Sequence, residues 1–186
     1  MLKKTKAFIL IEYTVYLFII LTIFSFSILK IKKVNENLKK KEAIIKIVNI
    51  VDKYCNKSFK RKKYKFIFET ENKNIKVYDL FGKEPIDQIN LPSILDYKIP
   101  YNGNYINKFV FDSTTNSNLT KSFSIYIFNN KKAEYRISFY LFRVNKILKI
   151  NVYKSLLSQA MDKKEILENY NDDEFVKERW IKINDY

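Results

Sequence analysis

The chain has 186 residues and carries 35 lysines and arginines against 20 aspartates and glutamates, a formal net charge of +15 at pH 7. It contains no histidine and a single cysteine, Cys55, which excludes an intramolecular disulfide, a Cys/His zinc site and any catalytic dyad that uses histidine. With only two glycines it also lacks the glycine-rich loops that cradle phosphates, so we expect no catalytic activity and no cofactor. The length suits one membrane segment and one modest domain.

An apolar run from Ala7 to Leu29 follows a basic start at Lys3, Lys4 and Lys6. The run is long enough to cross a bilayer, which takes about 20 residues of helix. Tyrosines aside, its one ionisable side chain is Glu12. Because a carboxylate in lipid is costly, such a residue normally has a specific partner.

Three interpretations of this run stay open. A cleaved secretory signal peptide would use the basic start and the small residues of Ser25-Phe26-Ser27, although the run exceeds the usual ~7–15 apolar residues. A plain signal anchor fits the hydropathy but leaves Glu12 without a role. The third interpretation comes from the residues that surround Glu12.

The segment from Lys6 to Glu12 (KAFILIE), followed by a long apolar helix, resembles the processing site of type IV prepilins and pseudopilins. That family has a short basic leader, a small residue, phenylalanine, three mostly apolar residues and glutamate. Ala7 stands where the family more often has glycine, and Ile9 stands where threonine is frequent. The resemblance is confined to residues 1–30.

The resemblance implies cleavage by prepilin peptidase between Ala7 and Phe8, with residues 1–7 as the leader and N-methylation of the new terminus. It also implies that Glu12 aligns the subunit in a filament by pairing with the free amine of a neighbouring subunit, which offsets the burial of both charges. The implied partners are other pilin or pseudopilin subunits, the peptidase and the cytoplasmic membrane. The N-terminus would face the cytoplasm, and the C-terminal domain would lie outside the membrane, at the cell surface or in the periplasm after assembly.

Beyond a predicted span of residues 8–30, residues 31–57 are expected to continue as an amphipathic helix. Its apolar positions recur at helical spacing: Val34, Leu38, Ile44, Ile45, Ile47, Val48 and Val51. The lysines between them, Lys40 included, are expected on the opposite, solvated face. Because no glycine or proline precedes Gly82, one continuous helix is favoured, and two helices with a bend at residues 30–37 are the alternative.

Residues 58–186 are predicted to form an extracytoplasmic domain that is mostly strand. Alternation of apolar and polar residues predicts a hairpin from residues 64–69 and 75–80. Residues 81–104 hold all three prolines and are expected to be a long irregular connection with a short strand near residues 94–99.

An antiparallel meander is predicted next, from residues 105–112, 122–128, 133–144 and 147–153. Both faces of this meander carry bulky side chains, so another part of the protein must pack against each face. Phe123, Ile125 and Ile127 are expected on one face, and Tyr126 and Phe128 on the other.

The C-terminal tail is predicted to be helical. One helix should cover residues 155–170, with Leu156, Ala160 and Leu167 in register. A last short helix should start at the acidic residues 172–174, which we interpret as a helix start and not as a calcium site, and carry Phe175, Val176 and Trp180. The predicted fold class is therefore α+β: a long N-terminal helix packed on an antiparallel sheet, with C-terminal helices, in a pilin-like layout.

Two functional hypotheses follow. The first is a minor pilin or pseudopilin of a type IV pilus, competence or type II secretion filament; the choice among these three machines stays open. The second is a single-pass membrane protein whose basic extracytoplasmic domain binds DNA or cell-wall polyanions, with Glu12 incidental. Two strands, Tyr64-Lys65-Phe66 and Asn107-Lys108-Phe109, resemble an aromatic and basic surface for single-stranded nucleic acid, although a half-buried strand of a lysine-rich protein has the same pattern. Cys55 is expected to be a small packed residue.

Overall fold

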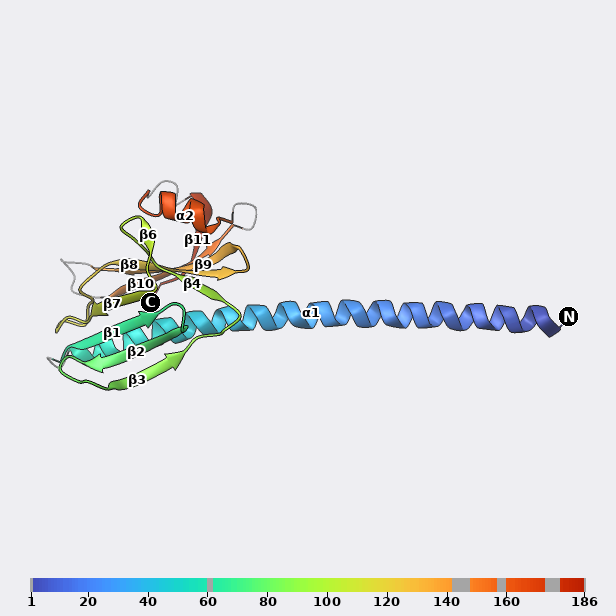
Figure 1. Ribbon diagram of the computed structural model, residues 1–186, viewed down its shortest axis with the longest axis horizontal. Coiled ribbons are helices and arrows are strands. Elements are labelled where there is room, and N and C mark those ends of the chain that lie inside the picture. Colours follow the sequence, from blue (N-terminus) through green and yellow to red (C-terminus); the bar gives the residue numbers. More distant parts are fainter. Residues whose placement is uncertain (1, 60–61, 142–147, 157–159, 173–177, 186) are drawn as a thin grey trace. The chain divides into compact units, whose positions relative to one another are not determined.

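A computed structural model describes residues 2–59, 62–141, 148–156, 160–172 and 178–185 (Figure 1). The protein is α+β, with one long N-terminal helix and antiparallel sheets. Its internal contacts divide it into two units, Met1–Lys39 and Lys40–Tyr186, which are described separately.

Helix α1 (Leu2–Ser58) is uninterrupted, so the alternative of two helices separated near residues 30–37 is wrong. Its sequence contains no glycine or proline to break it. The helix ends where the Ser58 hydroxyl donates to the Cys55 carbonyl oxygen (2.5 Å) and the Phe59 amide donates to that of Asn56 (3.3 Å). The first unit consists of the α1 residues up to Lys39.

Within the second unit, one face of α1 is buried against the sheets. The buried positions recur at helical spacing: Lys40, Ala43, Ile44, Ile47, Val48, Ile50, Val51, Tyr54, Cys55 and Ser58. This corrects the expected amphipathic pattern, because Val34, Leu38 and Ile45 are exposed and Lys40 is buried. The helix carries apolar residues on two faces, and only the position of the sheets decides which face is covered.

Four strands of the second unit form the first sheet, in the order β3-β2-β1-β7. All neighbours are antiparallel, and the predicted hairpin is confirmed as β1 and β2. The strands are β1 (Tyr64–Glu69), β2 (Asn74–Asp79), β3 (Pro85–Asn90) and β7 (Lys108–Asp112). Strand β3 corrects the prediction of an irregular connection over residues 81–104.

Five strands form the second sheet, in the order β11-β10-β9-β8-β4. They are β4 (Asp96–Lys98), β8 (Phe123–Asn129), β9 (Lys132–Tyr140), β10 (Lys149–Ser155) and β11 (Trp180–Asp185). A separate two-stranded pair joins β5 (Pro100–Tyr101) to β6 (Asn104–Tyr105). The predicted meander is confirmed for β8, β9 and β10, but β7 pairs with β1 in the first sheet and not with β8.

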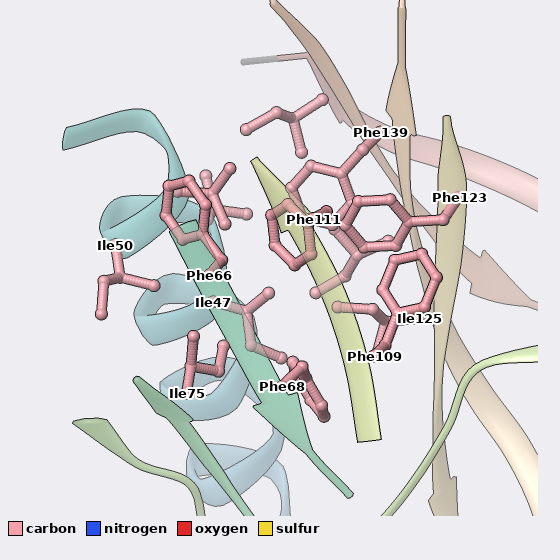
Figure 2. Close-up of a cluster of buried hydrophobic side chains, with 14 of the residues drawn as sticks. Ile47, Ile50, Phe66, Phe68, Ile75, Phe109, Phe111, Phe123, Ile125 and Phe139 are labelled. Carbon is pink, nitrogen blue, oxygen red and sulfur yellow. The ribbon is translucent and has the colours of Figure 1, made fainter. Parts of the chain in front are cut away.

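Aromatic side chains from both sheets meet the buried face of α1 in one core. Figure 2 shows phenylalanines of β1 and β7 lying between Ile47 on the helix and Phe123 and Phe139 on the second sheet. The rings of Phe66 and Phe111 stack with centroids 4.8 Å apart, and those of Phe123 and Phe139 at 4.6 Å. Such aromatic burial stabilises the domain strongly per residue.

The outer face of the second sheet has a smaller cluster of its own, formed by Tyr126, Phe128, Ala133, Met161, Ile166 and Trp180. The two predicted faces of β8 are therefore confirmed, with Phe123, Ile125 and Ile127 in the main core. Helix α2 (Lys163–Asn169) supplies Ile166 to this cluster, and its N-terminus is capped by Asp162 and Glu165 in a capping box.

The first helix of the predicted tail is shorter than expected. Ser155 ends β10, and helix begins only at Lys163, so a helix over residues 155–170 is wrong. Trp180 belongs to β11 and not to a last helix, because it pairs across the sheet with Ser155. Phe175 and Val176, with the acidic Asp173 and Glu174, lie outside the described residues.

Candidate functional site

The predicted processing site lies within the first turns of α1. Ala7 and Phe8, together with the leader lysines Lys3, Lys4 and Lys6, are part of this helix. The structure describes the side chains of the chain from Ile11 onward, so Glu12 is the first of the predicted site residues whose side-chain contacts are defined.

Glu12 is exposed on α1 and accepts one hydrogen bond from within the helix. The Tyr16 hydroxyl, one turn later, donates to its Oε1 at 3.2 Å. Among the side chains that the structure describes, which do not include Lys3, Lys4 and Lys6, no lysine or arginine lies within ion-pair distance of this carboxylate. A single neutral hydrogen bond leaves most of the acceptor capacity of a carboxylate unused.

The helix around Glu12 presents apolar side chains on every side. Its large hydrophobic residues between Ile11 and Ile31 are 47% to 72% exposed. The hydroxyls of Thr22, Ser25 and Ser27 are satisfied within the helix, because they donate to the carbonyl oxygens four residues earlier at 2.7, 2.8 and 2.9 Å.

A candidate membrane span therefore lies in α1 between Ile11 and Ser58. Its most apolar 18-residue window has a mean hydropathy of 2.1, and none of that window is buried inside the protein. This exposure distinguishes it from the core helix of a water-soluble protein, whose apolar face would be covered.

A second candidate site lies beside the C-terminal end of β2, where Phe81 is 93% exposed. Phe81, Leu80 and Asp79 line a shallow hollow of about 380 Å³ together with Lys62 and Lys63. We call Lys62, Lys63 and Phe81 the basic–aromatic tip. It was not predicted from the sequence, because nothing in the local pattern shows that Phe81 stays uncovered.

The two strands proposed from sequence as an aromatic and basic surface do not form one. Tyr64, Phe66 and Phe109 are all buried in the main core, so they present no rings to solvent. The alternative interpretation, half-buried strands of a lysine-rich protein, is correct for both.

Comparisons of the chain with protein-family models, with curated proteins and with solved structures found no match. Two features of the chain itself point to a function: the candidate membrane span with Glu12, and the basic–aromatic tip.

Cys55 has the packed, unreactive character expected for it. Its side chain is 1% exposed, its Sγ lies 3.9 Å from the Asn118 carbonyl oxygen, and burial raises the pKa of the thiol. Within the part of the chain that the structure describes, no group of three or more histidine, cysteine, aspartate or glutamate side chains is placed to hold a metal ion.

Proposed function

We propose that this chain is a minor pilin or pseudopilin, a non-catalytic subunit of a type IV pilus, competence or type II secretion filament that is matured by prepilin peptidase. The observation that carries the proposal is the combination of an apolar helix exposed around its circumference with one carboxylate, Glu12, that has no cationic partner among the side chains described from Ile11 onward. The residues before Phe8, which resemble a prepilin leader, also support the proposal.

Assembly would satisfy both features at once. A packed bundle of such helices would cover their apolar side chains, and cleavage after Ala7 would create an amine on Phe8 that can pair with Glu12 of a neighbouring subunit. A carboxylate buried among helices without that amine would be strongly destabilising, so the pair would fix the alignment of subunits. The domain's own core, anchored to α1 through Ile47 and its neighbours, would then be displayed on the filament.

The decisive experiment is the intact mass of the protein extracted from membranes of cells with an active prepilin peptidase. The expected mass lacks Met1–Ala7. The same protein from cells without the peptidase should keep them. Retention of Met1–Ala7 in the presence of the active peptidase would overturn the proposal.

The second candidate function is a single-pass membrane protein whose basic domain binds DNA or another polyanion. The basic–aromatic tip favours it, since lysines contact phosphates and an exposed ring stacks on unpaired bases. Salt-dependent binding of single-stranded DNA by the full chain in detergent tests it. Phe81→Ala should weaken that binding, whereas Ile94→Ala, at a residue that is also exposed, should not.

A further inference from the structure

The first sheet ends in an open edge at β3. Among the described strands, β3 pairs with β2 alone, and none of its six residues is buried. Directly after it, the Leu91 amide donates to the Lys73 carbonyl oxygen at 2.8 Å, so the backbone of Leu91 faces β2. Because the backbone groups of successive residues alternate between the two sides of a strand, those of Asn90 and Gln88 face away from β2. This edge can therefore accept another strand.

Two lysines of α1 reach across to β3 and leave a hollow between helix and strand. Lys46 Nζ donates to the Asn90 carbonyl oxygen at 2.9 Å, in agreement with a carbonyl that faces the open side. Lys53 Nζ lies 2.7 Å from Oδ2 of Asp87. The hollow has a volume of about 280 Å³, and its apolar lining comes from three isoleucines, Ile45, Ile50 and Ile89. Since Ile45 is 52% exposed, an apolar side chain can reach this lining from outside.

The second sheet has an open edge with apolar side chains at β11. Among the described strands, β11 pairs with β10 alone, and like β3 it is six residues long. Its isoleucines Ile181 and Ile183 are 53% and 44% exposed. Because they are two positions apart, both point to the same face of the strand. An exposed edge strand with apolar side chains is a site at which another strand adds.

The two open edges lie on different sides of the second unit. Figure 1 shows β3 along its lower side and β11 along its upper side. A contact between β3 of one copy and β11 of the next would therefore be head to tail, and the pair of copies would still carry one free edge of each kind. Contacts of this type continue from copy to copy and build open assemblies.

We propose that β11 of one copy adds to the β3 edge of a second copy and inserts an isoleucine into the hollow between α1 and β3. Main-chain bonds would give the affinity, and alternate side chains, Ile181 and Ile183, would give the fit. Lys46 already occupies the Asn90 carbonyl, so the ladder would use Gln88 and the residues before it. The contact goes beyond the proposed function, because neither cleavage after Ala7 nor Glu12 takes part in it.

A pair of six-residue strands buries less than the ~1,200 Å² of a stable isolated interface. The contact is therefore expected between copies that are held close together, as they are when anchored in one bilayer. This sets the conditions of the test, which uses the full, uncleaved chain in proteoliposomes.

The test is disulfide cross-linking between two differently tagged variants. One carries Gln88→Cys, and the other carries Lys182→Cys or Asn184→Cys, positions that alternate with the two isoleucines of β11 as Gln88 alternates with Asp87 and Ile89. At least one of these pairs should give roughly fivefold more heterodimer than Gln88→Cys with Lys131→Cys, an exposed position in the turn between β8 and β9. The native Cys55 is buried and can stay in place.

A charge placed in the hollow should prevent the contact. Ile45→Lys, added to the Gln88→Cys chain, should lower the heterodimer yield roughly fivefold, because the ammonium would be covered by the added strand. Ile183→Lys in the other chain should act in the same direction. Ile94→Lys, at an exposed position outside both edges, is the matched control and should leave the yield unchanged.

Three results would overturn the proposal. The first is a heterodimer yield no higher than that of the Lys131→Cys pair. The second is a cysteine variant that links to itself more than to the other, which would indicate a symmetric contact. The third is a yield that Ile45→Lys does not change; because Ile45 is exposed, this variant is expected to fold.

Discussion

Lys40 and Glu134 form the most enclosed ion pair among the described residues. Lys40 Nζ lies 2.7 Å from Oε2 and 3.0 Å from Oε1 of Glu134, and the two side chains are 5% and 25% exposed. Asn129 Nδ2 donates to the same carboxylate at 2.9 Å. The pair joins helix α1 to strand β9 across 94 residues of sequence, so it ties the start of the buried helix face to the second sheet.

Glu134→Gln should therefore lower the free energy of unfolding by about 1–3 kcal/mol, because it leaves the buried Lys40 ammonium without its counter-ion. Urea unfolding of the full chain in detergent measures this. Glu168→Gln is the matched control, since its pair with Lys164 is 60% and 84% exposed and should contribute less than about 0.5 kcal/mol. Adding Lys40→Met to Glu134→Gln should recover part of the loss; equal effects of Glu134→Gln and Glu168→Gln would contradict the assigned role.

Asp87 is expected to contribute to the acid sensitivity of the domain. Its Oδ2 accepts from Lys53 Nζ at 2.7 Å and from the Tyr54 hydroxyl at 2.9 Å, and the bond from Lys53 holds the pKa of this carboxyl below its ordinary value. Because the native carboxyl binds protons less readily than the unfolded one, its stabilisation is present above the unfolded pKa of about 3.9 and is lost as the pH falls through the native pKa.

Asp87→Asn should consequently flatten the loss of stability between about pH 5 and pH 2, relative to the wild type. Urea midpoints of both proteins across this range give the comparison. Parallel curves for the two proteins would show that another group controls the acid response.

At the scale of elements, the buried face of α1 can be tested by a pair of isoleucines two positions apart. Ile47 is 0% exposed in the main core, and Ile45 is 52% exposed. Ile47→Ala should lower the free energy of unfolding by about 2–5 kcal/mol, since it leaves a cavity among aromatic rings. Ile45→Ala should change it by less than about 0.5 kcal/mol, and a reversed order would mean that the other helix face is the covered one.

The strands show what a local pattern can and cannot predict. The alternation of apolar and polar residues along the sequence identifies five strands, because each has one face in the core: β1, β2, β8, β9 and β10. It does not identify their neighbours: β7 follows the chain toward β8 but pairs with β1, where Phe109 and Phe111 lie opposite Phe68 and Phe66. Strand β3 was missed because it is an edge strand that begins with a proline and has no buried residue, and it becomes a strand only through its pairing with β2.

The candidate sites also differ in whether the sequence alone reveals them. Glu12 is visible in the sequence, since a lone carboxylate in an apolar run needs no tertiary structure to be noticed. Phe81 was only one of 15 phenylalanines in the chain. Its significance depends on its exposure beside Lys62 and Lys63, and no sequence spacing encodes that exposure.

At the scale of the whole molecule, Glu12 separates the two candidate functions. Glu12→Ala should leave the protein cleaved and inserted in the membrane but should remove most of it from the sheared filament fraction, because the buried amine of the neighbouring subunit would lose its partner. Quantitative immunoblots of the filament and membrane fractions measure this distribution. Tyr16→Phe, which removes only the hydrogen bond within the helix, is the control and should assemble nearly as the wild type does.

Normal incorporation of the Glu12→Ala protein, together with unchanged DNA binding, would favour the polyanion-binding alternative. Loss of incorporation with intact DNA binding would mean that the basic–aromatic tip serves a filament subunit.

The burial of Cys55 makes the native chain silent toward thiol reagents. A cysteine introduced at an exposed position outside helix α1, such as Phe81 or Ile94, would therefore be the only site that a membrane-impermeant maleimide labels. Comparing whole cells with opened cells would then report directly which side of the membrane each position occupies, without first removing the native thiol from the core.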